Sequence, residues 1–237
     1  MRGRPEPTPR AFVNVDEVLD ALRSHADASR LPGMARVGIQ TSHALGVSVP
    51  AIRRIAKRAG RDQQLAQALW ATEIHEARMV AALVADPEPM SFRAMDAWAG
   101  DLDSWDLTDL LADTYVRTGH VDRAIRMWGR ARHGFTKRLA FSMLARLAVG
   151  HHDEPDRTYL GYLPLIRDAA TDDRNEVKKA VNWALRQIGK RNRTLHDAAI
   201  AEADALLELG DRTARWIARD ALRELQKPEI VARIPSY

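Results

Sequence analysis

The chain has 237 residues, of which 36 are basic and 32 acidic, and it contains no cysteine. The lack of cysteine excludes disulfides, thiolate zinc sites, iron–sulfur clusters and cysteine nucleophiles. Hydrophobic residues make up 46% of the chain and the mean hydropathy is −0.36, and no apolar run approaches the roughly 18 residues of a membrane span. These properties predict a globular cytoplasmic protein that is not inserted in a membrane.

The positive charge is carried almost entirely by arginine, since 30 of the 36 basic residues are Arg and 6 are Lys. Guanidinium groups bind phosphate through two parallel hydrogen bonds and stay charged at physiological pH, so this bias suits a polyanionic partner. A coding sequence rich in arginine codons is the alternative explanation. Composition alone does not decide between them.

The chain begins with a segment rich in Pro and Arg, residues 1–12, for which we expect a flexible tail before a single domain over 13–237. Asn14 to Glu17 form a capping box that opens a helix through about Asp27. Ser48 and Pro50 begin the next helix. Apolar periodicity predicts further helices at 62–71, 73–85, 91–99, 103–118, 122–131, 134–149, 157–170, 174–189, 194–208 and 211–226.

No stretch alternates apolar and polar residues as a strand would, so the predicted fold class is all-α. Eleven or twelve helices in pairs with short breaks favour an α-solenoid of HEAT-like or armadillo-like repeats with a concave basic surface. A compact irregular helical domain is the alternative, because no strong repeat motif can be read from the letters.

The helix predicted at 103–118 places an indole and a carboxylate on one ridge. Trp105 and Asp109 lie one turn apart, away from the stripe of leucines expected to be buried. One interpretation is a functional carboxylate beside an aromatic surface. The other is that Trp105 packs into a neighbouring repeat and Asp109 pairs with an arginine.

Three later helices carry basic ridges. On 174–189 one ridge surrounds Trp183 with cations, which suits a nucleic-acid surface, although a tryptophan that bridges two repeats explains it equally well. On 134–149, Lys137 and Arg138 occupy the first turn, where a cation opposes the helix dipole, and salt bridges to a neighbouring repeat are the ordinary explanation. The cations predicted to face phosphates are Lys179, Arg186, Lys190, Arg212, Arg215 and Arg219.

Other chemical signatures are weak. The sequence has no Gly-rich phosphate loop, no nucleophile elbow and no metalloprotease motif. His151 and His152 precede Asp153 in a polar break without further ligands at suitable spacing, so no metal and no cofactor is expected. His75 and Glu76 fall within a helix and are expected to be a packed or surface pair.

These residues together resemble the AlkD family of DNA alkylation repair glycosylases, which are built from HEAT-like repeats. The resemblance runs from about Met34 to Arg223. It is carried by an ordered set of short segments: Met34-Ala35-Arg36 with Gly38-Ile39-Gln40-Thr41, Val49-Pro50-Ala51-Ile52-Arg53-Arg54, Leu69-Trp70 with His75-Glu76-Ala77-Arg78, Trp105 with Asp109, Lys137-Arg138 with Ala140, and Lys179 to Arg186.

The resemblance implies a monofunctional glycosylase of base excision repair that hydrolyses the N-glycosidic bond of N3- or N7-alkylated purines in double-stranded DNA. Asp109 matches the catalytic carboxylate, Trp105 and Trp183 match two aromatic cleft residues, and Arg138 matches a cleft arginine. The family needs no cofactor. A monomer in the cytoplasm, associated with the nucleoid through its DNA, is expected.

The sequence departs from the family pattern where active members carry aromatics. Val37 follows Met-Ala-Arg, and Glu176 and Val177 stand before the second cleft tryptophan. Two other classes of function therefore stay open. One is a HEAT module that binds DNA without cutting it, and the other is a solenoid that binds proteins.

Overall fold

The computed structural model describes residues 14–150 and 153–235, and the chain falls into two compact units, Met1–Pro89 and Met90–Tyr237. The tail expected at 1–12 lies outside the described residues. The single domain over 13–237 remains a prediction.

The described residues form helices and connecting turns, with no strand among them. In the first unit the helices are α1 (Val15–Ser24), the 3-10 turn η1 (Ala28–Arg30), α2 (Leu31–Arg36), α3 (Val49–Ala59), α4 (Gln63–Trp70) and α5 (His75–Val84). In the second they are α6 (Phe92–Gly100), α7 (Trp105–Tyr115), α8 (Val121–Trp128), α9 (Gly134–Gly150), α10 (Asp156–Leu160), α11 (Leu163–Ala169), α12 (Asn175–Ile188), α13 (Arg193–Glu208), α14 (Arg212–Leu225) and α15 (Pro228–Val231). The all-α prediction is confirmed.

Most helices begin within about two residues of the predicted start, and at several of them the residue before the helix caps exposed backbone N–H groups. Asn14 accepts from the backbone N–H of Glu17, and Asp211 accepts from those of Thr213 and Ala214. The helix predicted at 157–170 is wrong as one element. The chain breaks after Leu160, and Pro164 near the start of α11 cannot donate a backbone hydrogen bond to a preceding turn.

A buried glutamate organises the first unit. The Glu76 carboxylate on α5 is fully buried and accepts hydrogen bonds from the backbone N–H groups of Leu45, Gly46 and Val47, at 2.8, 2.7 and 3.2 Å. These bonds hold the loop that leads into α3. Gly46 has φ +76°, and an added Cβ would lie 2.1 Å from the Asp27 carbonyl oxygen, so only glycine fits there. Of the two alternatives expected at 75–76, a packed pair or a surface pair, the structure has both side chains buried.

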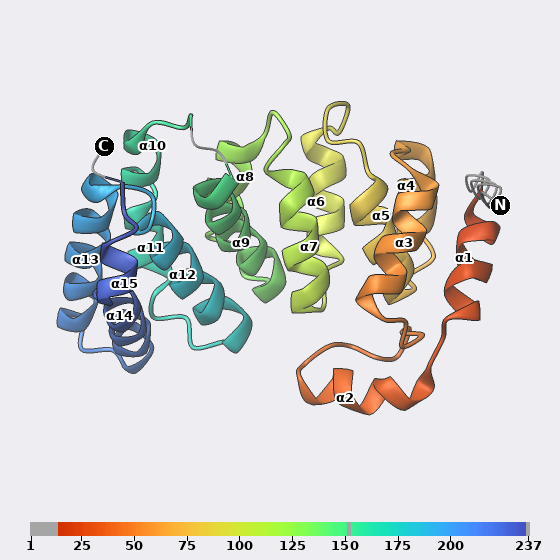
Figure 1. Cartoon of the computed structure of the whole chain (residues 1–237), viewed down its shortest axis with the longest axis horizontal. Helices are drawn as coiled ribbons and strands as arrows, with labels where there is room; N and C mark the ends of the chain where they lie inside the picture. The colour runs from red at the N-terminus through yellow and green to blue at the C-terminus, as the bar shows by residue number, and fades with distance from the viewer. Residues whose placement is uncertain (1–13, 151–152, 236–237) are drawn as a thin grey trace, which may run out of the picture. The chain divides into compact units, whose positions relative to one another are not determined.

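Four helices of the second unit, α7, α9, α12 and α14, run parallel to one another and form a row, visible in Figure 1 from yellow-green to blue. The direction follows from the contacts, since residues pair in ascending order along each neighbouring helix. On α7 and α9, Asp109 meets Arg138 and Asp113 meets Arg146. On α12 and α14, Asn182 meets Asp220 and Arg186 meets Glu224. We call α7, α9, α12 and α14 the parallel row.

A second set of helices returns the chain between members of the parallel row. Helix α8 packs on α9, α11 on α12 and α13 on α14. These three helix pairs pack against one another through α9, α12 and α14, which is the arrangement predicted for HEAT-like repeats. Aromatic rings fill this core around Trp128, which stacks on Phe92 at 5.6 Å between ring centroids and donates its indole N–H to Asp96.

Candidate active site and nucleic-acid interface

The Asp109 carboxylate lies on α7 and is held by two residues of α9. Arg138 donates from Nε to Oδ1 at 3.0 Å and from Nη2 to Oδ2 at 2.6 Å, and the Ser142 hydroxyl donates to Oδ1 at 2.7 Å. Of the Asp109 side chain 19% remains exposed. The carboxylate is thus fixed by three hydrogen bonds without being turned into the core.

Arg138 is committed to contacts inside the protein. Besides the two bonds to Asp109, its Nη1 donates to the backbone carbonyl of Glu176 at the start of α12, at 2.9 Å. Only 8% of its side chain is exposed. A guanidinium has five N–H donors, so two are left after these three bonds. The sequence left open whether Asp109 is a functional carboxylate or only the partner of an arginine, and the structure does contain the arginine pair. The same pair also fixes the orientation of the carboxylate.

The two predicted aromatic residues both lie on the parallel row. Trp105 is the first residue of α7, one turn before Asp109, and is exposed. Trp183 on α12 is partly buried, and the guanidinium of Arg146 lies 5.0 Å from its ring centroid. Arg146 also forms an ion pair with Asp113, one turn after Asp109, at 2.9 Å. Arg146 therefore links the ridge of Asp109 to the Trp183 ring.

The basic ridge of α12 is only partly available to a ligand. Lys179 is exposed. Arg186 and Lys190 instead form ion pairs with Glu224 on α14, and Arg186 also lies 3.8 Å from Asp220. Burial alone would raise the pKa of Glu224, but the hydrogen bond from Lys190 and the charge of Arg186 outweigh it, and the pKa is lowered. These two cations have their charge compensated by carboxylates.

The basic ridge of α14 is exposed. Arg212, Arg215 and Arg219 point to solvent, and Arg215 donates to the backbone carbonyls of Gly210 and Asp211. Trp216, which the sequence prediction missed, lies among them and is 42% exposed. The signal was the one used for Trp183, an aromatic within a basic ridge, and it is equally visible in the letters from Arg212 to Arg219.

The first turn of α9 carries a second ion-pair cluster that is structural. Lys137 donates to Asp172 at 2.9 Å, and Arg174 donates to both oxygens of the same carboxylate. The hydrogen bonds from Arg174 hold the pKa of Asp172 well below its usual range against the opposing effect of burial, and the Lys137 bond and charge add to the lowering. The interpretation of Lys137 as a partner in a salt bridge to a neighbouring repeat is confirmed.

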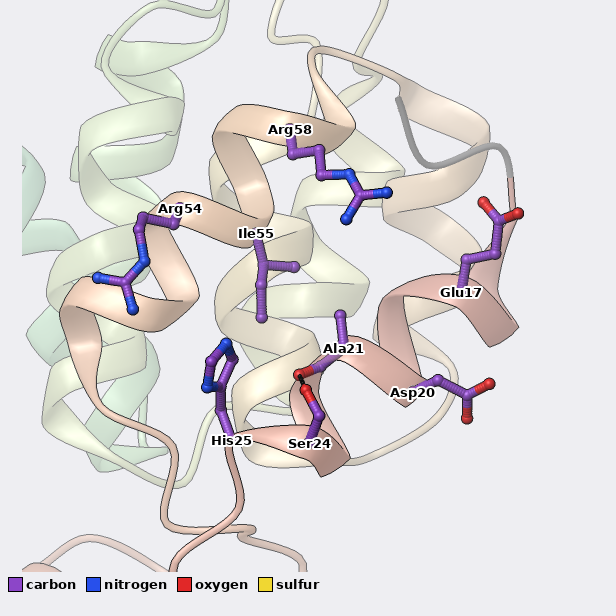
Figure 2. Close-up of a pocket in the computed structure, with 8 residues that line it drawn as sticks. All are labelled: Glu17, Asp20, Ala21, Ser24, His25, Arg54, Ile55 and Arg58. Carbon is purple, nitrogen blue, oxygen red and sulfur yellow. Dashed lines mark hydrogen bonds between the residues drawn. The ribbon is translucent and has the colours of Figure 1, made fainter. Parts of the chain in front are cut away.

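The first unit offers a hollow between α1 and α3 that carries charges of both signs. Figure 2 shows Glu17 and Asp20 on α1 and Arg54 and Arg58 on α3, with His25 at the end of α1. Val37, where the family resemblance expects an aromatic, is 58% exposed. A hollow lined by two carboxylates and two guanidinium groups has no single sign with which to attract a polyanion.

Within residues 14–150 and 153–235, no three His, Asp or Glu side chains gather closely enough to hold a metal ion. His151 and His152 lie outside the described residues. None of the described helices has the length and apolarity needed to cross a membrane.

Comparison with known proteins identifies the family. Residues 18–225 match the family model described as DNA alkylation repair enzyme, so the chain belongs to this family. A solved structure from a new family of proteins related to the HEAT-like repeat DNA glycosylases, with affinity for branched DNA structures, is 21% identical, with a TM-score of 0.72 over 81% of this chain and 83% of that one. A designed armadillo repeat protein in complex with a (KR)4 peptide is 13% identical, with a TM-score of 0.37 over 93% and 96%. No curated protein sequence matches the chain.

Proposed function

We propose that the protein is a monofunctional DNA glycosylase that releases cationic N3- and N7-alkylated purines from double-stranded DNA. The observation that carries the proposal is the Asp109 carboxylate, which is fixed by Arg138 and Ser142, partly exposed, and one turn from the exposed indole of Trp105. Membership of the DNA alkylation repair enzyme family supports it.

The chemistry needs little more than a well-placed negative charge. An alkylated purine is cationic and leaves as a neutral base, so positive charge develops on the deoxyribose as the glycosidic bond breaks. The Asp109 carboxylate stabilises this charge and orients the attacking water. Because Arg138 and Ser142 already hold the carboxylate, it does not have to reorganise during the reaction. The leaving group needs no proton from an acid.

The remaining site residues bind the DNA. Trp105 and Trp183 pack against the sugar and backbone around the lesion, with their electron-rich faces toward the cationic nucleotide. Arg138 can reach a phosphate only through the two N–H donors that its protein contacts leave over. Lys179, Arg186, Lys190, Arg212, Arg215 and Arg219 supply affinity that does not depend on base sequence, and those without a carboxylate partner contribute most.

The test is release of methylated bases from a methylated duplex. The wild-type protein is expected to free 7-methylguanine or 3-methyladenine, and Asp109→Asn to lower the single-turnover rate by at least about 10²- to 10³-fold while the duplex is still bound. Asp197→Asn is the control, because Asp197 is also paired with an arginine, Arg193, but lies exposed on α13, outside the parallel row. Its rate should stay close to wild type.

Two outcomes would contradict the proposal. Equal rates for the parent and Asp109→Asn would remove the assigned role of the carboxylate. Tight duplex binding with no base release, at enzyme in excess over lesion, would favour a module that binds DNA without cutting it. The exposed Val37 is consistent with such a module, because an aromatic that could contact the lesion is lacking at this position. Including a four-way DNA junction in the binding assay tests whether this chain shares the affinity for branched DNA of the similar structure.

A further inference from the structure

The exposed side of α14 combines several arginines with one exposed tryptophan. One hollow there is lined by Arg212, Arg215, Trp216, Arg219, Asp220 and Arg223. Four of these six side chains are guanidinium groups and one is an indole. An indole with 42% of its surface exposed costs free energy in water, because its apolar area stays hydrated.

The arginines of this hollow are less compensated by carboxylates than Arg186 and Lys190 on α12, which both pair with Glu224. The hollow's single carboxylate, Asp220, already accepts from Asn182 at 2.6 Å and pairs with Arg223 and Arg186. Among the described residues, neither Arg212 nor Arg219 has an ion-pair partner. The hollow therefore presents uncompensated positive charge, which matches the charge of a nucleic-acid backbone.

The exposed Trp216 ring offers a flat surface on which an unpaired base can stack. Trp216 lies beside the arginines, and Lys178 of α12 places its ammonium 5.6 Å from the ring centroid. In a duplex the base faces are stacked on each other and are not open to a side chain. An aromatic ring among cations is the arrangement by which proteins hold unpaired nucleotides, with the bases stacked on the ring and the phosphates on the cations.

We propose that the α14 face is a binding site for single-stranded nucleic acid, in which Trp216 stacks on an unpaired base and Arg212, Arg215 and Arg219 bind the adjoining phosphates. This site is separate from the Asp109 carboxylate. The inference deepens the proposed function, since it assigns to the same DNA-binding protein a preference for a duplex that continues into an unpaired strand.

The experiment compares the affinity of the full chain for three undamaged ligands at one salt concentration. They are a blunt duplex, the same duplex with a tail of about ten thymidines, and the duplex with a tail of equal length and charge that lacks bases, a length within the range that such sites cover. Tails are placed at either strand end in turn. We expect the thymidine tail to tighten binding by about 5- to 100-fold, as stacking of one base on an aromatic ring does, and the base-free tail to tighten it much less.

Two variants of Trp216 test whether its ring causes the tighter binding of the thymidine tail. Trp216→Ala should bring the ratio of tailed to blunt affinity close to that of the base-free tail, and Trp216→Phe should restore part of it. Arg157→Gln, on the exposed face of α10, serves as the control and should leave the ratio unchanged.

The inference is overturned if the thymidine tail binds no better than the blunt duplex, if the base-free tail binds as well as the thymidine tail, or if Trp216→Ala keeps the full ratio. Failure of the proposed function is distinguishable, because base release is measured separately on the methylated blunt duplex. If the protein releases methylated bases but binds tailed and blunt duplexes equally well, only the proposed α14 site is refuted.

Discussion

At the scale of single residues, the tryptophans differ in how far they are buried. Trp70, Trp98 and Trp128 are buried in the two units, whereas Trp105 and Trp216 are exposed on the parallel row. An exposed indole keeps apolar surface in contact with water, which costs free energy. We propose that both exposed tryptophans contact DNA, Trp105 one turn before the Asp109 carboxylate and Trp216 among the arginines of α14.

Ser142 offers the sharpest prediction at this scale. Its buried hydroxyl supplies one of the three hydrogen bonds on Asp109, and it touches no solvent. We expect Ser142→Ala to lower the single-turnover rate of base release by about tenfold, the equivalent of one lost hydrogen bond, while the dissociation constant for the duplex stays unchanged. A lower rate at unchanged duplex affinity would show that Ser142 acts by positioning Asp109.

A matched control for Ser142 is Thr118→Val. Thr118 also has a buried hydroxyl, which donates to the carbonyl of Tyr115 rather than to Asp109. Its loss should reduce stability by a similar amount without changing the rate. If both variants lower the rate equally, Ser142 acts only through the stability of the fold.

At the scale of elements, ion pairs join α9 to the helices on both sides. Arg138 reaches α7 and the start of α12, and Lys137 reaches Asp172 in the turn before α12. These contacts explain why two cations occupy the first turn of α9, where the helix dipole disfavours them. Carboxylates and a carbonyl of neighbouring elements compensate the unfavourable position.

The Asp172 cluster predicts how stability depends on pH. Its pKa is lowered in the folded protein from an ordinary value of 3.8, so its stabilising contribution is complete above that value and is lost as the pH falls further. Asp172→Asn should therefore reduce the free energy of unfolding at neutral pH by about 1–3 kcal/mol, and the difference from wild type should shrink below about pH 4.

Urea unfolding of both proteins from neutral pH downward measures this difference. Asp168→Asn is the control, because Asp168 forms a solvent-exposed pair with Arg130 at 3.8 Å and should contribute little at any pH. A difference for Asp172→Asn that stays constant down to the lowest pH would show that the carboxylate's charge is not what stabilises the cluster.

At the scale of the whole molecule, the net charge of +4 understates how unevenly the cations are available. Arg138, Arg186 and Lys190 are each paired with a carboxylate, while Arg212 and Arg219 have no such partner among the described residues. Long-range attraction of DNA depends on the uncompensated charges, because a paired cation contributes little field at a distance.

Salt dependence tests this distinction. The logarithm of duplex affinity falls linearly with the logarithm of salt concentration, with a slope of about −0.9 for each phosphate contact. The double variant Arg212→Gln with Arg219→Gln should make the slope less steep by about 1 to 2. Arg186→Gln should change the slope by clearly less, since Glu224 and Asp220 already neutralise that cation. Equal changes for the two variants would contradict the assignment of available charge.

What the sequence by itself determined is local. Apolar periodicity and capping residues located most helices, and the spacing of Trp105 and Asp109 placed them on one ridge, because the helix period dictates which side chains share a face. Which ridge meets which was decided only by the tertiary structure. Asp109 finds Arg138 29 positions along the chain, and Arg186 finds Glu224 38 positions along. Such pairings depend on how neighbouring repeats pack, and the periodicity within one helix carries no information about that.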